Sequence, residues 1–384
     1  MPLDILFISN GHGEDLIAAR IAQDLSDLRV AGFPLVGMGE AYRRSEIPVI
    51  GPRHAMPSGG FVLRDAAALR ADVKAGLGKL LLEQSRFLAS MATPRLTVAV
   101  GDLLPVAASL LLAGPRAFVG CNKTDFYESW GSSYLAAEIA LFKWADLQVY
   151  PRDHLTHQRL IHLGVRSESL GNPMMDGIDP EWPGEDGVLG ILPGSRPEAF
   201  DNFARILPCL EAVGRRMPVE ALLAAPTALA PQGWETIAQE AGWEVSPEAF
   251  RKGALILRRD HDFTQVIRRS RVLLGLAGTA NEQAVGCGRP VVAFAGSGPQ
   301  YNLQFAKLQA ELLGPGLLLT RGNPEDVAAE VLKAFEPAHQ EAARQAGRQR
   351  MGKPGGAERI AGSLRRKLDG EPFSANRKKS FTFS

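Results

Sequence analysis

The sequence predicts an α/β protein made of two doubly wound domains, each a parallel sheet covered by helices. Short β-rich runs alternate with stretches of helical period along nearly the whole chain, which is the pattern of βαβ units. With 384 residues, the chain also exceeds one typical domain. A stretch rich in Gly, Pro and Asp, LGNPMMDGIDPEWPGEDG, separates the runs into two series and is typical of a linker.

The strands expected before the linker are DILFIS, FPLVG, LTVAVG, RAFVG and DLQVY, and those after it are VLGIL, EALLAA, ALILRR, RVLLGL, PVVAFA and LLLT. They are apolar throughout, as expected when helices cover both faces of a sheet. We therefore expect an N-terminal domain over 1–170, a hinge over 171–187, a C-terminal domain over 188–350, and a helix and frayed tail over 351–384. The carboxyl ends of the strands would face a cleft, where open α/β sheets bind ligands.

Composition narrows the functional classes. The formal net charge is +1, so no overall field favours nucleic acid. The three cysteines are far apart with no CxxC pair, which argues for a reducing compartment and against structural zinc. The N-terminus lacks a signal-peptide pattern, and the longest apolar stretch, 103–114, is too short to span a bilayer. We expect a cytoplasmic protein that can also meet the inner face of a membrane.

The segment LGILPGSRPEAFDNF, residues 189–203, turns from a strand into a helix. Gly194 allows an unusual backbone angle, and Ser195 with Glu198 predicts a capping box. The helix N-terminus and Arg196 together suit a phosphate. The alternative is a plain helix cap beside a solvated arginine. Neither GxGxxG nor a P-loop pattern is present.

A second segment, RVLLGLAGTANEQAVGCGRPVVAF, is followed by the loop AGSGPQYNLQ. The pairing of LPGSR with GTA-x-x-x-A-x-x-x-GRPVV resembles the donor domain of lipid-A-disaccharide synthases and related GT-B glycosyltransferases. GNPMMD is similar to that family's Gly-His-Pro-Leu-Val-Asp. The resemblance covers residues 1 to about 350, with its specific motifs over 171–305.

The resemblance implies that the corner at Gly194, Ser195 and Arg196 holds the diphosphate of a UDP-sugar. Gly278, Thr279 and Ala280 would form a second phosphate- or sugar-facing turn, and Gln300 and Asn302 would touch the donor sugar. The family places a glutamate, a candidate ribose ligand, at the position of Gln283, whereas this chain's acid is Glu282. One helical step is about 100°, so the two side chains are not interchangeable, although an amide can also bind a diol. We expect no cofactor and no obligatory metal, because the acid of RDHDF at Asp262 fits a helix cap.

On the acceptor side, TVAVGDLLP ends a strand at Asp102, where a carboxylate can act as general base. The synthases carry an aspartate in a similar Gly-x-Asp context. The alternative is that Asp102 caps the helix containing Pro105.

The turn SNGHGED loosely matches a family motif and offers His12 and Glu14, with Gly11 and Gly13 expected to be needed by the turn. His12 can orient an acceptor, contact a phosphate or simply be exposed. The segment CNKTDFYESWG, with Asn122 and Lys123, can line an acceptor pocket or be an ordinary packed loop.

Residues 53–86 combine basic and apolar side chains. This pattern suits docking on an anionic membrane surface or, as a second interpretation, a helix with one face toward the core.

Together with these observations, the resemblance implies a metal-independent, inverting hexosyltransferase that moves a GlcNAc-type sugar from UDP to a lipid-linked or amphipathic acceptor. A nucleotide-sugar 2-epimerase of the same fold and a non-catalytic nucleotide-sugar binder are the alternatives. The sequence makes no prediction of oligomeric state.

Overall fold

The computed structural model describes residues 2–54, 70, 73–127, 133–178, 184–298 and 301–370. The chain divides into two compact units. The first comprises Met1–Asp125, Trp130–Asp176 and Pro354–Ser384, and the second comprises Phe126–Ser129 and Gly177–Lys353. The sequence predicts 351–384 as a separate helix and tail, whereas in the structure the segment from Pro354 onward belongs to the first unit.

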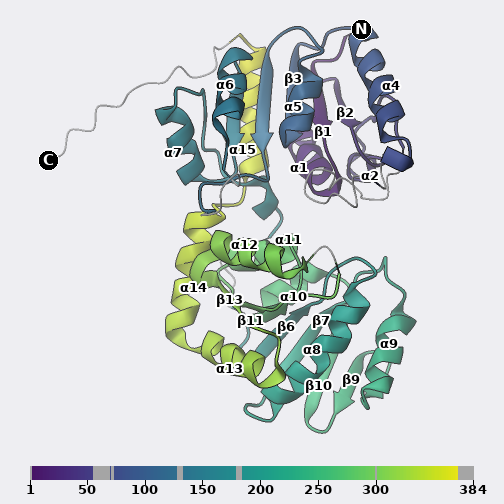
Figure 1. The fold of residues 1–384 in the computed structure, drawn as a ribbon, viewed down its shortest axis with the longest axis vertical. Coiled ribbons are helices and arrows are strands. Elements are labelled where there is room, and N and C mark those ends of the chain that lie inside the picture. The colour runs from purple at the N-terminus through teal and green to yellow at the C-terminus, as the bar shows by residue number, and fades with distance from the viewer. Residues whose placement is uncertain are drawn as a thin grey trace, which may run out of the picture. The chain divides into compact units, whose positions relative to one another are not determined.

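The first unit, which carries β1, β2 and β3 in Figure 1, contains a five-stranded sheet. The strand order is β2-β1-β3-β4-β5, and every pair is parallel. Its strands are β1 (Ile5–Ser9), β2 (Val30–Pro34), β3 (Leu96–Gly101), β4 (Arg116–Gly120) and β5 (Gln148–Pro151). The strand expected over 33–37 begins three residues earlier, at Val30. The register brings Ser9 beside Val100 and Gly101 beside Gly120, so the segments that follow β1, β3 and β4 leave one edge of the sheet together.

Helices cover both faces of this sheet. Along β1, Ile5 and Phe7 join a buried cluster with α1 and α15, whereas Leu6 and Ile8 join another with α4. Both sets are fully buried, which explains why the strand is apolar at every position. The helices of the unit are α1 (His12–Gln23), α2 (Glu40–Arg44), α4 (Leu77–Ser90), α5 (Leu103–Ser109), α6 (Ala136–Trp144), α7 (His154–His162) and α15 (Gly356–Leu368).

The helix α15 is attached to the first unit along one face and at its N-terminus. Its apolar side chains Ala357, Ile360, Ala361 and Leu364 enter the core beside β1 and β3. At its N-terminus, the carboxylate of Asp176 accepts the backbone N–H groups of Gly355 at 2.6 Å, Gly356 at 3.0 Å and Ala357 at 2.7 Å. The GNPMMD motif therefore caps this helix, through the residue that follows the 3₁₀ turn Pro173–Met175.

The second unit contains an eight-stranded sheet in the order β13-β12-β11-β6-β7-β10-β9-β8. The strands are β6 (Val188–Leu192), β7 (Glu220–Ala224), β8 (Glu244–Val245), β9 (Ala249–Lys252), β10 (Leu255–Asp260), β11 (Val272–Gly275), β12 (Val291–Ala293) and β13 (Leu317–Leu319). Six strands run parallel, as predicted. β9 pairs antiparallel with β10 and β8 antiparallel with β9, an edge that the sequence analysis missed.

The helices of the second unit are α8 (Ala199–Gly214), α9 (Pro231–Glu240), α10 (Phe263–Arg269), α11 (Thr279–Gly286), α12 (Leu303–Leu313), α13 (Pro324–Phe335) and α14 (Pro337–Arg350). Asp262 caps α10 by accepting the N–H of Thr264 at 2.9 Å, as the sequence suggested for the acid of RDHDF.

Candidate functional site

The corner after β6 has the backbone that the sequence predicted, but not the predicted cap. Gly194 adopts φ 116°, in the region that favours glycine. The capping box of Ser195 and Glu198 is wrong: α8 begins only at Ala199, and Glu198 occupies the N-cap position without a side-chain hydrogen bond. Residues 196–199 form a backbone turn instead, in which the N–H of Ala199 donates to the carbonyl of Arg196 at 2.8 Å.

The turn after β11 lies beside this corner. The N–H of Leu276 donates to the carbonyl of Leu192 at 2.8 Å, so both segments leave the sheet as neighbours. Gly278 is the N-cap of α11, and Thr279 and Ala280 are its first residues. The N-termini of two helices, α8 and α11, therefore emerge at the same sheet edge, and the positive ends of their dipoles suit anions.

A loop of five uncharged residues, Phe294–Gly298, follows β12 and completes this edge. Asn302, expected to touch a donor sugar, caps α12 by accepting the N–H of Phe305 at 2.9 Å. Gln300 lies outside the described residues. The two candidate ribose ligands, Glu282 and Gln283, are both buried on α11.

A buried polar network fastens the turn after β11 to the segment after the loop. The amide nitrogen of Asn281 lies 3.1 Å from the carbonyl of Gly275, 3.1 Å from Tyr301 Oη and 3.0 Å from Gln309 Oε1. Gln309 in turn donates to the carbonyl of Gly278 at 2.8 Å. The sequence analysis did not single out Asn281, Tyr301 or Gln309. No local pattern marks them, because Asn281 stands beside two other buried polar residues of α11 and Tyr301 precedes α12. The network becomes visible only in three dimensions.

In the first unit, Asp102 stands at the carboxyl end of β3. It is the N-cap of α5, accepting the N–H of Leu104 on Oδ1 at 2.9 Å, which is the alternative that the sequence left open. Its second oxygen, Oδ2, accepts a hydrogen bond from Asn10 Nδ2 at 3.1 Å. The cap does not exclude a role as base, because each carboxylate oxygen has two lone-pair positions.

Glu14 joins the same edge from α1. Its Oε1 accepts a hydrogen bond from Asn122 Nδ2 at 2.9 Å. Gly101, with φ 122°, packs against the Glu14 side chain so closely that an added Cβ would lie 2.8 Å from its Cγ. The ends of β3 and β4 and the first turn of α1 therefore share one polar cluster, made of Asn10, Glu14, Asp102 and Asn122.

The glycines of SNGHGED differ in what they do. Gly11 is the N-cap of α1 with φ 119°, so the turn does need a glycine there. Gly13 lies inside α1 without a positive φ, and an added Cβ would meet nothing within 4 Å, so the expectation that the turn needs it is wrong. His12 is the first residue of α1, and its side chain lies outside the described part of the structure.

Beneath this turn lies a chain of three buried hydroxyl and carboxyl groups. Ser9 Oγ donates to Asp15 Oδ1 at 2.6 Å and lies 2.6 Å from Tyr42 Oη. Burial raises the pKa of Asp15 to about 7, against the lowering effect of the hydrogen bond from Ser9. Asp15 is therefore a carboxyl group that titrates near neutrality below the candidate site.

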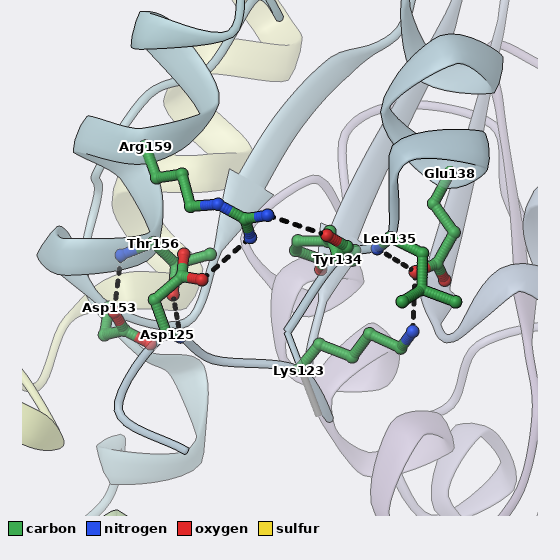
Figure 2. A network of polar contacts seen from close by, with 8 residues as sticks. All are labelled: Lys123, Asp125, Tyr134, Leu135, Glu138, Asp153, Thr156 and Arg159. Atoms are coloured by element: carbon green, nitrogen blue, oxygen red, sulfur yellow. Dashed lines mark hydrogen bonds and ion pairs between the residues drawn. The ribbon is translucent and has the colours of Figure 1, made fainter. Parts of the chain in front are cut away.

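Lys123 belongs to a packed network, shown in Figure 2. Its Nζ lies 2.6 Å from Glu138 Oε2, and the Glu138 side chain is only 5% exposed. In the same loop, Asp125 pairs with Arg159 at 2.8 Å and donates its backbone N–H to Thr156 Oγ1 at 3.0 Å (Figure 2). The alternative of an ordinary packed loop fits Lys123 better than a pocket lining does.

The predicted membrane-docking stretch is only partly described. Residues 55–69 and 71–72 lie outside the described part of the chain. In α4, the stripe Leu77, Leu80, Gln84 and Leu88 is buried, so this helix has the core-facing pattern that was the second interpretation. Within the described ranges, no helix is long and apolar enough to cross a bilayer, and no three His, Cys, Asp or Glu side chains gather as metal ligands.

No protein-family model matches the sequence, and no curated protein matches it. Solved structures do match over nearly their whole length. A putative UDP-N-acetylglucosamine 2-epimerase from Listeria monocytogenes has a TM-score of 0.60 at 13% identity, with 96% of this chain and 98% of that chain covered. The S. aureus MnaA–UDP co-structure has a TM-score of 0.59 at 13% identity, covering 95% and 96%. The calicheamicin glycosyltransferase CalG4 has a TM-score of 0.57 at 15% identity, covering 96% and 97%.

Identities this low show the fold alone. The chain has the two-domain GT-B fold, which is shared by UDP-GlcNAc 2-epimerases and glycosyltransferases. The likeness to lipid-A-disaccharide synthases in particular remains a prediction from the motifs.

Proposed function

We propose that this chain is an enzyme that binds a UDP-sugar at the edge formed by β6, β11 and β12 and acts on the sugar. The observation that carries the proposal is the meeting of three glycine-containing segments there: the Gly194–Arg196 corner, the Gly278 turn and the loop Phe294–Gly298. Two of them precede helices whose N–H groups and dipoles favour a diphosphate, and Arg196 supplies a cation.

The first candidate reaction is 2-epimerisation of a UDP-GlcNAc-type sugar. It is favoured because a putative UDP-N-acetylglucosamine 2-epimerase and a protein whose structure holds UDP share this fold over nearly the whole chain. Inverting carbon 2 requires a group that removes a proton from that carbon and a group that returns it. The reaction needs no acceptor, so conversion of the nucleotide sugar alone would identify it.

The second candidate is inverting transfer of the sugar to an acceptor hydroxyl, and the position of Asp102 favours it. In this reaction Asp102 takes the hydroxyl proton, the hydroxyl oxygen bonds to the anomeric carbon, and the bond from that carbon to the diphosphate breaks. Arg196 and the helix N-termini offset the charge of the departing UDP. A lipid-linked acceptor is the form that the motif resemblance suggests, and the buried stripe of α4 adds nothing in its favour.

The test begins with calorimetric titration of UDP, UDP-GlcNAc and GDP into the wild type, Arg196→Ala and Arg215→Ala. Arg215 is the matched control, an exposed arginine at the other end of α8 that pairs with Glu325. We expect UDP binding that weakens in Arg196→Ala and is unchanged in Arg215→Ala. Absence of nucleotide binding in the wild type would end the proposal.

The wild type is then incubated with UDP-GlcNAc, with and without lipid extracts, and followed by NMR. A 2-epimer formed without acceptor supports the first candidate, and UDP released only with acceptor supports the second. Binding without either product identifies the chain as a non-catalytic nucleotide-sugar binder.

A further inference from the structure

One face of α8 holds the loop Phe294–Gly298. Glu198, Asn202 and Arg205 are spaced by four and three residues, so they lie along one side of the helix and its entry. The loop runs antiparallel to them: Gly298 packs on Glu198, Ser297 bonds to Asn202, and Ala295 bonds to Arg205.

The central contact is made by Asn202, which is 4% exposed and 95 residues away from its partner in the loop. Its Oδ1 accepts the N–H of Ser297 at 3.0 Å, while its Nδ2 donates to the carbonyl of Pro193 at 2.9 Å. The amide of this one side chain therefore links the loop, through its oxygen, to the residue before the Gly194–Arg196 corner, through its nitrogen.

The outer contacts fix the two ends of the loop. Arg205 Nη1 donates to the carbonyl of Ala295 at 2.7 Å, and its guanidinium lies 5.1 Å from the ring centroid of the buried Phe294. At the far end, an added Cβ on Gly298 would lie 2.4 Å from Glu198 Cγ, so only glycine allows this approach. The loop thus follows α8 through specific contacts along its described length.

We infer that Asn202 and Arg205 are positioning residues of the proposed UDP-sugar site, a step that rests on the proposed function and deepens it. The loop carries no charged side chain, so it suits the neutral, hydroxyl-bearing sugar, while the corner with Arg196 suits the diphosphate. Arg205 contacts and positions the loop Phe294–Gly298 but not the corner. Asn202 places the loop and the corner together, so it couples the part of the site that holds the sugar to the part that holds the phosphates.

The test compares Arg205→Met, Asn202→Ala and the control Arg215→Met by calorimetric titration of UDP and UDP-GlcNAc, with thermal unfolding of each variant. We expect Arg205→Met to weaken UDP-GlcNAc binding by about 3- to 10-fold, the effect of one net hydrogen bond, and to leave UDP binding within about twofold. Asn202→Ala should weaken both ligands, and Arg215→Met neither.

For Arg205→Met, the split between the two ligands separates positioning from stability, because a variant that is merely less folded loses both affinities together. For Asn202→Ala, the thermal unfolding curve makes that separation. Two results would overturn the inference: an equal loss of affinity for UDP and UDP-GlcNAc in Arg205→Met, or unchanged affinities in both Arg205→Met and Asn202→Ala. In either case, UDP binding by the wild type would leave the proposed function standing. If the wild type binds neither ligand, the proposed function fails, and the inference fails with it.

Discussion

Asn10 donates a hydrogen bond from Nδ2 to Oδ2 of Asp102 at 3.1 Å, across 92 residues of sequence. With the N–H of Leu104 bound to Oδ1, both oxygens of this carboxylate are held in place. A group fixed in this way is oriented before any substrate arrives, which is what a general base requires. The same contacts are also compatible with a purely structural helix cap.

The substitution Asp102→Asn separates these two roles. Asparagine caps helices about as well as aspartate, so α5 should persist and thermal stability should change little. If Asp102 is the base, turnover falls by about 100-fold or more while UDP affinity stays constant. The measurement is the rate of whichever reaction the wild type catalyses, beside a UDP titration. Full turnover in the variant would assign Asp102 to the cap alone.

Two glycine substitutions should have opposite effects. Gly194→Ala forces a Cβ into a positive-φ conformation and should cost about 1–2 kcal/mol of stability together with UDP affinity. Gly13→Ala lies within α1, where the added Cβ meets nothing, and should stabilise by about 0.5–1 kcal/mol. Urea unfolding measures both. A stable, tightly binding Gly194→Ala would show that the corner does not need this backbone angle.

The raised pKa of Asp15 predicts a pH dependence of stability. The folded chain keeps this proton up to about pH 7, whereas the unfolded chain releases it near the ordinary aspartate pKa of 3.8. The contribution of Asp15 to the free energy of unfolding therefore falls as pH rises from about 4 to about 7, by an amount on the order of a few kcal/mol.

Asp15→Asn should flatten that part of the profile, because the amide does not titrate. The variant should still fold, since the amide carbonyl can accept the hydrogen bond from Ser9. The check is denaturant unfolding of both proteins at several pH values. Parallel profiles over this range would contradict the assignment.

Removing the cap at Asp176 should loosen α15. Asp176→Ala leaves three backbone N–H groups without their acceptor, and we expect a loss of about 1–2 kcal/mol, with faster hydrogen exchange along α15. Asp262→Ala is a matched control, since that carboxylate caps α10 through the single N–H of Thr264. Equal effects of the two substitutions would mean that Asp176 is an ordinary cap.

The sequence predicted the parallel strands well because a strand covered on both faces is apolar at every residue. It missed β8 and β9, which are short and include exposed positions such as Glu244 and Arg251 at the sheet edge. It also misplaced the start of α8, because a capping-box pattern does not reveal that the backbone turns once more before the helix.

The site contacts could not be predicted in the same way. Asn10 and Asp102 meet only because β1 and β3 are adjacent in one register. Asn202 meets Ser297 only because α8 follows β6, the loop with Ser297 follows β12, and both strands flank β11. Strand order is a property of the whole fold, and no local pattern records it. Asparagines within helices are common, so residue type alone does not mark these positions.

The return of α15 to the first unit has a consequence for how the protein is made. During synthesis, Gly177–Lys353 leaves the ribosome before the helix that completes the core around Ile5 and Phe7. The first unit is thus the first to be synthesised and the last to be complete. Its early strands cannot form their full core contacts until Ala357, Ile360 and Leu364 have been synthesised. A premature stop after residue 353 would retain both segments of the second unit, Phe126–Ser129 and Gly177–Lys353. It would expose the apolar face of the first unit, which is then a substrate for chaperones and proteases.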